Sequence, residues 1–287
     1  MNLTMRRQKY REILEGDKCV YPASVFDPIS ARIAEDLGFE VGMLAGSIAS
    51  ATVLGAPDLI VLTLSELAQQ AYRICRAGNI SLMVDADHGY GNALSVKRTV
   101  EELEVAGVAA LTIEDTLLPQ SFGNAKAQQL VSIEEGMGKM KAALAGRRDP
   151  TLSIIGRTSA INIVGLEEAL QRAKAYQAAG VDALFLLGAK TRAEVISVRS
   201  EVRLPLILGG VSGELADQAF LDENGVRIAL QGHLPFQAAV KATYDTMKAL
   251  RGGHSPSEIA VTADSDELMA QLIRESDNNM WLKEFLS

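Results

Sequence analysis

Acidic side chains end two apolar segments of the sequence. Asp85 and Asp87 follow the apolar run 80–84, and Glu114 ends the run 110–113. Carboxylates at the end of a buried strand are unfavourable unless a cation or hydrogen-bond donors neutralise them. Carboxylate oxygens suit hard divalent ions. Mg²⁺, with Mn²⁺ as the second candidate, could bind one carboxylate directly and the others through water. Any single acid could instead cap the following helix, but three acids at successive strand ends favour a metal site.

A basic side chain ends another apolar run. Arg157 lies in the segment Ile154–Ser159, which has the pattern of a further buried strand. A guanidinium group beside carboxylates can bind a substrate carboxylate through two hydrogen bonds or stabilise developing negative charge. The alternative is a structural ion pair with Glu114, and one side chain can do both. We therefore take Arg157 as a candidate catalytic and substrate-binding residue.

Two further segments have residue types suited to a small-molecule site. Gly46, Ser47 and Ile48 follow a predicted strand, and small residues there leave backbone N–H groups and the Ser47 hydroxyl free to hold an anion. His233 follows the last predicted strand and has the best position for chemistry of the three histidines. We predict that His233 helps to hold the substrate and is not a metal ligand, because the carboxylates already suit a hard ion. The alternative is a core histidine bonded to a backbone carbonyl.

One supersecondary unit recurs along the chain: an amphipathic helix, a glycine, a short β-branched or leucine-rich run, and then polar residues. The segments 106–111 and 179–184 are near copies of one another. A helix that ends at glycine, followed by a strand buried on both faces, is typical of a parallel α/β sheet. Eight strands are predicted in this way, at residues 19–23, 40–45, 80–85, 110–114, 153–158, 183–187, 205–208 and 226–230.

Helical segments lie between most of these strands, for example at 93–106, 167–179 and 235–250. Eight βα units is the number found in a (β/α)8 TIM barrel, so the sequence predicts an α/β barrel. An open doubly wound sheet is the alternative, and the strand count favours the barrel. In a barrel the loops after the strands form the active site, which would bring the candidate residues together at one mouth.

No linker rich in proline, glycine and serine divides the chain, so we predict that residues 1–255 form one catalytic barrel domain. Residues 256–287 differ in composition, with seven acidic residues against two basic ones. A helix is expected in this segment from a capping residue near Asp264 and the apolar spacing after it. We interpret 256–287 as an acidic C-terminal helical tail for packing or subunit contact, and not as a separate domain.

The composition is that of a globular protein. The chain has 28 Lys and Arg against 36 Asp and Glu, a net charge of −8, and 48% apolar residues. This acidic balance argues against nucleic acid and anionic membranes as partners, because phosphate binding needs a basic face. Two cysteines cannot form a disulfide framework, and residues 1–7 lack the apolar core of a signal peptide. We therefore expect a cytoplasmic protein.

Together these segments resemble the phosphoenolpyruvate mutase/isocitrate lyase superfamily. The matching pieces follow one another along the chain and are Gly46-Ser47, Pro57-Asp58, Asp85-x-Asp87-x-Gly89-Tyr90-Gly91, Ala110–Asp115 and Arg157-Thr158. The resemblance implies Mg²⁺ on Asp85, with Asp58, Asp87 and Glu114 acting through water. It also implies a homotetramer, a dimer of dimers with one terminal helix exchanged between neighbours. The implied substrates are α-keto acids or carboxylates that react through an enolate.

The loop after the fourth predicted strand narrows the expected reaction within this superfamily. Lyases carry a Lys-Lys-Cys-Gly-His type of segment there, whereas residues 117–126 contain no cysteine and no lysine pair. Phosphoenolpyruvate mutases have basic and Asn side chains on this loop, and Gln120 and Ser121 supply no such charge. By contrast, the segments 86–94 and 114–119 and the triplet Gln-Gly-His at 231–233 resemble the oxaloacetate decarboxylase branch.

The resemblance therefore implies a magnesium-dependent decarboxylation of oxaloacetate, an α-keto dicarboxylate. The products would be pyruvate and CO₂, formed through an enolate that the metal stabilises as a Lewis acid. The alternatives within the superfamily are a C–C lyase acting on isocitrate or 2-methylisocitrate and a phosphonopyruvate-type mutase or hydrolase.

Overall fold

The strands form where the apolar runs predict them. The computed structural model describes residues 3–120, 122–123, 128–259 and 264–286. Seven predicted strands agree with the observed ones to within one residue at each end. The first prediction, 19–23, is largely wrong, because β1 begins only at Ala23. The strands are β1 (Ala23–Ser24), β2 (Val41–Leu44), β3 (Ser81–Asp85), β4 (Ala110–Glu114), β5 (Ser153–Thr158), β6 (Ala183–Leu186), β7 (Leu206–Leu208) and β8 (Val226–Ala229).

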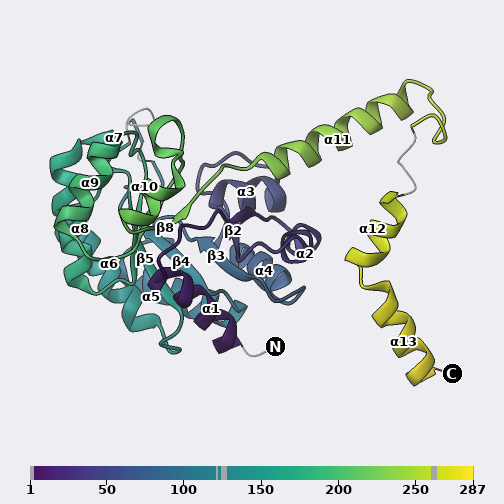
Figure 1. The fold of residues 1–287 in the computed structure, drawn as a ribbon, viewed down its shortest axis with the longest axis horizontal. Coiled ribbons are helices and arrows are strands. Elements are labelled where there is room, and N and C mark those ends of the chain that lie inside the picture. Colours follow the sequence, from purple (N-terminus) through teal and green to yellow (C-terminus); the bar gives the residue numbers. More distant parts are fainter. Residues whose placement is uncertain (1–2, 121, 124–127, 260–263, 287) are drawn as a thin grey trace.

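The eight strands form one parallel sheet in the order β1 to β8, which curls in the manner of a TIM barrel (Figure 1). Val20, which precedes β1, forms a parallel bridge with Ile228 of β8. The Val20 N–H donates to the carbonyl of Arg227 at 2.9 Å, and the Val20 carbonyl accepts from Ala229 at 3.0 Å. The first segment of the chain therefore lies beside the last strand. The sequence prediction of an α/β, barrel-like fold is confirmed.

Helices connect the strands, and glycine ends two of them as the repeated Ala-Gly-Val segments predict. Gly107 and Gly180 adopt φ 95° and 97°, a left-handed conformation that residues with a Cβ disfavour. The helices up to β8 are α1 (Leu3–Glu15), α2 (Pro28–Asp36), α3 (Gly46–Leu54), α4 (Leu64–Cys75), α5 (Ala93–Ala106), α6 (Ile133–Gly146), α7 (Ala160–Ile163), α8 (Leu166–Ala179), α9 (Arg192–Glu201), the 3₁₀ helix η1 (Gly213–Leu215) and α10 (Gln218–Glu223).

Both faces of the strands are buried, and alternate residues face opposite sides of the sheet. Met83 and Ile155 belong to an inner cluster to which most strands contribute. Leu82, one position away from Met83, belongs to a second cluster that includes the helices around the sheet. Two residues after Met83 and Ile155 come Asp85 and Arg157. The alternation of the strands therefore turns both side chains toward the inside, at the carboxyl end of the sheet.

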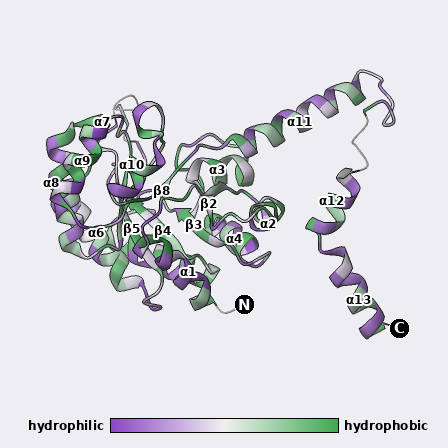
Figure 2. Cartoon of the chain, in the orientation of Figure 1, coloured by the Kyte–Doolittle hydropathy of each residue, from purple (hydrophilic) through white to green (hydrophobic). Residues whose placement is uncertain are grey.

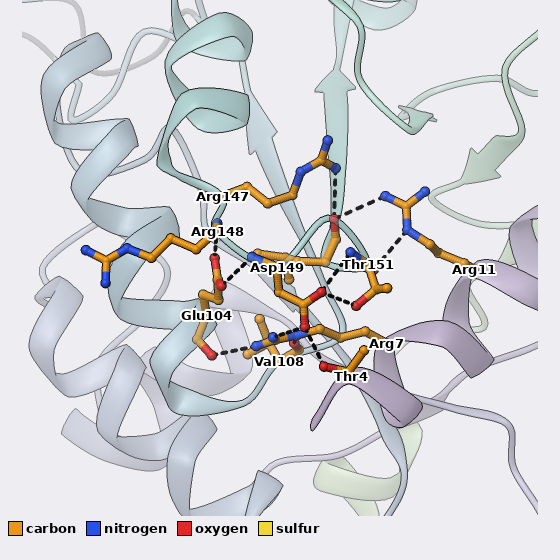
Figure 3. Close-up of polar contacts among 10 residues, drawn as sticks. Thr4, Arg7, Arg11, Glu104, Val108, Arg147, Arg148, Asp149 and Thr151 are labelled. Carbon is orange, nitrogen blue, oxygen red and sulfur yellow. Dashed lines mark hydrogen bonds and ion pairs between the residues drawn. The ribbon is translucent and has the colours of Figure 1, made fainter. Parts of the chain in front are cut away.

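Helix α1 covers the amino end of the sheet. Its Tyr10 packs in the inner cluster, and its Arg7 and Arg11 bind acids of the loops below the strands. Arg7 Nη1 lies 2.8 Å from Asp149 Oδ2, and Thr4 and Thr151 also donate hydrogen bonds to the Asp149 carboxylate (Figure 3). These contacts close the end of the sheet opposite to Asp85.

The chain leaves the sheet after β8. Helix α11 (Leu234–Arg251) has no buried residue and projects away from the strands (Figure 1). Apolar and polar residues alternate along it (Figure 2). None of the described helices has the length and apolar character needed to cross a membrane.

The tail contains two helices, α12 (Asp264–Leu272) and α13 (Glu275–Leu286), where the sequence predicts one. Arg274, at φ 58°, separates them. Arg274 also binds Asp36 of α2 at 2.8 Å, and Arg32 of α2 donates to the Leu272 carbonyl at 2.6 Å. These polar contacts and the buried Leu272 attach the tail to α2.

Candidate active site

Three strand-end side chains meet at the carboxyl end of the sheet. Parallel register pairs Glu114 of β4 with Arg157 of β5, and Asp85 of β3 with Thr112 of β4. The Arg157 guanidinium forms an ion pair with Asp85, and its Nη2 lies 3.4 Å from Glu114 Oε2. Thr112 donates a hydrogen bond of 2.9 Å to Asp85 Oδ1. The sequence prediction that these carboxylates and Arg157 come together thus matches the geometry.

The third acid, Asp87, lies in a tight loop directly after β3. Its φ is 48°, and Gly89 and Tyr90 follow with φ 77° and 60°. The Asp87 carboxylate packs against Gly46, where an added Cβ would come within 2.5 Å of Oδ1. A side chain at position 46 would therefore displace the Asp87 carboxylate from its present place.

The sequence predicts that the segment 46–48, which follows β2, has free backbone N–H groups that could hold an anion. In the structure these residues form the first turn of helix α3. The N–H groups of a first helical turn also lack intrahelical partners, so the capacity to hold an anion remains. The Ile48 side chain, however, is buried in the inner cluster.

Burial and like charge together raise the pKa of three acids at this mouth, Asp87, Glu114 and Asp58. Burial raises the pKa of Asp87 to about 9, with further contributions from Asp85, Glu114 and Asp58. Burial also raises the pKa of Glu114, although the charge of Arg157 opposes this. Partial burial and the charge of Asp85 raise the pKa of Asp58. A cluster of carboxylates that resist ionisation side by side is the electrostatic setting in which a cation binds favourably.

The candidate metal ligands fit a divalent ion that keeps part of its water shell better than an ion bound by protein atoms alone. All four candidate ligands are carboxylates, which suit Mg²⁺ or Mn²⁺. Within the described ranges, no group of three or more His, Cys, Asp or Glu side chains is close enough together to hold an ion directly. One direct carboxylate ligand with the others reached through water, as expected from the resemblance, is compatible with this spacing.

A cavity of ≈540 Å³ opens above these residues. Asp58, Asp87, Glu114 and Arg157 line it. Its other walls come from the segment between α3 and α4 and from the loops after β4, β5 and β6; of these, the sequence singled out only the loop after β4. These walls include Leu59, Ile60, Thr116, Leu118, Pro119, Gln120, Ser159, Asn162 and Leu187. Ser121 and residues 124–126 of the 117–126 loop lie outside the described residues.

His233 stands at the start of α11, beside β1. Its Nδ1 lies 2.9 Å from the Ser24 hydroxyl, the last residue of β1. Burial lowers the pKa of His233, and the charge of Asp85 partly offsets this. Among the described residues, neither His233 nor the segment 46–48 lines the ≈540 Å³ cavity. Their substrate-binding roles stay predictions.

Several polar residues that the sequence alone did not point to hold this site together. Thr112 is fully buried beside Asp85, and Thr116 donates to Glu114 Oε2 at 2.9 Å. Ser24 contacts His233, and the buried Lys139 of α6 donates to the His88 carbonyl at 3.0 Å. Thr112, two positions before Glu114 on β4, was the one available signal, since strand alternation gives both side chains the same orientation.

Curated relatives cover almost the whole chain. A Bradyrhizobium diazoefficiens protein named oxaloacetate decarboxylase is 56% identical over 277 residues, with 96% of each chain covered. A Rhodopseudomonas palustris protein of the same name is 56% identical over 274 residues, covering 96% of this chain and 94% of the relative.

Solved structures of lower identity share the fold. A phosphonopyruvate hydrolase complexed with oxalate and Mg²⁺ is 26% identical, with a TM-score of 0.86 over 98% of this chain and 99% of the other. An oxaloacetate acetylhydrolase in complex with 3,3-difluorooxalacetate is 27% identical, with a TM-score of 0.81 over 96% and 97% of the two chains. The sequence profile of phosphoenolpyruvate phosphomutase matches residues 10–251. Because this match spans the whole sheet and its mouth, the chain belongs to the phosphoenolpyruvate phosphomutase family.

Proposed function

We propose that this protein is an enzyme that decarboxylates oxaloacetate to pyruvate and CO₂ with the help of Mg²⁺, or of Mn²⁺ in its place. The observation that carries the proposal is the convergence of Asp85, Asp87, Glu114 and Arg157 on one mouth. Relatives at 51–56% identity carry the name oxaloacetate decarboxylase, which supports the choice of substrate. The alternative functions come from more distant members of the same family.

The carboxylates are proposed to hold the metal. Asp85 is assigned as the direct ligand, with Asp58, Asp87 and Glu114 acting through water. The bound ion would act as a Lewis acid that stabilises negative charge on the keto oxygen of the substrate. Thr112 and Thr116 orient Asp85 and Glu114 by hydrogen bonds of 2.9 Å, which reduces the freedom that metal binding would otherwise have to restrict.

Arg157 and His233 are proposed to act on the substrate. The C3–C4 bond breaks, its electron pair remains on the pyruvate enolate, CO₂ departs, and a proton from solvent completes pyruvate. The Arg157 guanidinium would bind a substrate carboxylate and stabilise the enolate charge. A neutral His233 would hydrogen-bond the C4 carboxylate or the keto oxygen without holding back CO₂, as a full positive charge would. The N–H groups of Gly46–Ile48 would bind a substrate carboxylate.

The rival reactions can be distinguished by their co-products. Phosphonopyruvate hydrolysis would release phosphate, and 2-methylisocitrate cleavage would release succinate, besides pyruvate in each case. The experiment supplies oxaloacetate, phosphonopyruvate and 2-methylisocitrate separately with Mg²⁺, and subtracts the rate without protein. We expect the highest kcat/KM with oxaloacetate. Faster turnover of either other compound would replace the proposed reaction with that one.

We also propose that the chain forms a homotetramer, a dimer of dimers in which α11 is exchanged between neighbours. The absence of any buried residue along the 18 residues of α11 supports this exchange. An apolar groove that includes Ile33, Ala34 and Leu37 of the α2 region lies beside the start of α11 and could receive the helix of a neighbour.

We further propose a closed barrel and a cytoplasmic location for this protein. The Val20–Ile228 bridge supports a closed (β/α)8 TIM barrel over residues 1–255, with 256–287 as an appendage. Both cysteines, Cys19 and Cys75, are buried and unpaired, which suits a reducing compartment such as the cytoplasm. Neither a nucleic acid nor a membrane is proposed as a partner.

A further inference from the structure

We propose that Lys139 of α6 is a positioning residue that holds the loop 85–91 in the shape required for divalent-metal binding. The inference rests on the proposed metal site, but it concerns a residue outside the mouth. Lys139 does not line the ≈540 Å³ cavity among the described residues, and its side chain is almost fully buried, with 3% exposure.

Three consecutive backbone carbonyls of the loop accept hydrogen bonds from three different elements. The Asp87 carbonyl accepts from a backbone N–H of β4 at 2.9 Å. The His88 carbonyl accepts from Lys139 Nζ at 3.0 Å. The Gly89 carbonyl accepts from the Thr99 hydroxyl of α5 at 3.0 Å. Lys139 therefore donates the middle one of three hydrogen bonds that hold successive carbonyls of the loop. Its acceptor belongs to His88, the residue that follows the proposed metal ligand Asp87.

The loop needs such anchors because of its backbone conformation. Asp87 and Tyr90 have φ 48° and 60°, in the left-handed region that residues with a Cβ disfavour. A conformation of this kind persists where surrounding contacts hold it. A donor that reaches the His88 carbonyl from a neighbouring helix fixes the peptide group between these residues, and with it the direction of the Asp87 side chain.

A lysine suits this position because of its charge as well as its length. Burial lowers the pKa of Lys139, while the negative charges of Glu135, Glu114 and Asp115 oppose that change. A charged donor forms a stronger hydrogen bond to a carbonyl than a neutral one, above all in a buried site. Lys139 thus combines a hydrogen bond to the loop with a positive charge behind the acidic mouth.

These two contributions have opposite effects on metal affinity. If Lys139 acted only through its charge, replacing it by a neutral residue would leave the mouth more negative and would tighten cation binding. If it positions the loop, the same replacement would weaken binding, because the carboxylates would lose their arrangement. The direction of the change therefore distinguishes a positioning role from an electrostatic one.

The experiment measures Mn²⁺ affinity by electron paramagnetic resonance of the free ion, with purified full-length protein and no substrate. Lys139→Met has a similar length and cannot donate a hydrogen bond. We expect Mn²⁺ affinity to fall about 10- to 100-fold, the range found for residues that orient metal ligands. Lys139→Arg, which keeps the charge and a donor, should recover part of that affinity. Affinity that is unchanged or higher in Lys139→Met would overturn the proposal.

Two control variants separate positioning from general damage. Lys141→Met makes the same change at an exposed position of α6 and should leave Mn²⁺ affinity unchanged. Met140→Ala removes core packing next to Lys139 and should lower thermal stability with little effect on affinity. An equal loss of affinity in Met140→Ala would show that Lys139 acts only through stability and would overturn the inference.

Two further outcomes are distinguishable. If Lys139→Met does not fold, Lys139→Gln, which is too short to reach the same carbonyl, replaces it with the same expected loss of affinity. If the unmodified protein binds no Mn²⁺, both the metal site of the proposed function and this inference fail. Normal binding in the unmodified protein with no change in the variants would reject the role of Lys139 alone.

Discussion

Asp85 receives its partners from the two strands that follow β3 along the sheet. Thr112 of β4 donates to one carboxylate oxygen, and Arg157 of β5 binds the other. Because strand register fixes both partners, substitutions at this mouth should change chemistry more than they change folding. The effects of single substitutions can therefore be measured by enzyme kinetics, and the stability of each variant serves as a check on its folding.

Arg157→Lys should lower kcat/KM for oxaloacetate by about 100-fold, the effect typical of removing one donor that stabilises developing charge. Lysine keeps the charge but loses the planar pair of donors that binds two carboxylates. Arg172→Lys is the matched control, because Arg172 is buried and forms an ion pair with Asp115 at 3.0 Å. Near-normal kinetics in Arg157→Lys, with only a lower melting temperature, would assign Arg157 to a structural ion pair.

His233→Gln should raise KM for oxaloacetate several-fold and leave metal affinity unchanged. Burial lowers the pKa of His233 from its ordinary 6.5, so the ring is neutral at pH 7 and becomes charged only in more acidic solution. As the pH falls below 6.5, the unmodified enzyme should therefore lose kcat/KM more steeply than the variant. His254→Gln, at an exposed position, is the control. A loss of Mn²⁺ binding in His233→Gln would contradict this role.

Among the secondary-structure elements, the strands and their ends were predicted well from the sequence. The hydrogen-bond partners of the site residues were predicted poorly. Asp85 and Glu114 could be placed because apolar runs mark the strands and parallel strands end at one edge. The partners depend on packing between distant segments. Thr112 lies 27 residues from Asp85, Lys139 lies 51 from His88, and Ser24 lies 209 from His233. The two-residue β1 also escaped prediction, since so short a strand leaves no periodic pattern.

Helix α1 should contribute measurably to the stability of the barrel-like sheet. Asp149→Ala leaves the buried Arg7 without its carboxylate, so we expect a loss of about 3 kcal/mol in the free energy of unfolding, measured in urea. Asp245→Ala, in an exposed pair with Lys241, should cost less than about 1 kcal/mol. Equal losses in the two variants would show that the α1 contacts add nothing beyond a surface ion pair.

The contribution of the Arg7–Asp149 ion pair to the free energy of unfolding should depend on pH. Burial alone would raise the pKa of Asp149. Hydrogen bonds from Thr151, Arg7 and Thr4 instead hold this pKa below its ordinary 3.8. The contribution of Asp149 is therefore complete above pH 3.8 and is lost as the pH falls through the lower value in the folded protein. Asp149→Ala should flatten the acid side of the stability curve. An unchanged acid slope would contradict this assignment.

At the scale of the whole molecule, α11 and the tail leave much apolar surface uncovered in one chain. Val240, Tyr244 and Met247 share one face of α11 and are more than half exposed. Trp281 and Phe285 of α13 are also exposed. Contiguous apolar surface of this kind is typical of subunit contacts. Among the described residues, one chain thus joins a sheet with an acidic mouth to a helix, α11, that has no buried residue.

Light scattering of the purified protein should therefore give an assembly of four chains. Tyr244→Asp places a charge on the apolar face of α11 and should dissociate the assembly. Ala242→Asp makes a similar change on the opposite face and should leave it intact. A monomer at micromolar concentration, or equal effects of the two variants, would refute the proposed exchange of α11.

Oxaloacetate decarboxylation should depend on a divalent ion bound at Asp85. This dependence is tested most directly by the rate of pyruvate release after EDTA treatment and dialysis, corrected for the rate without protein. The expected result is an inactive protein that regains full activity with Mg²⁺, and an Asp85→Ala variant that no metal restores. Full activity in the metal-free protein, or in Asp85→Ala, would contradict the account.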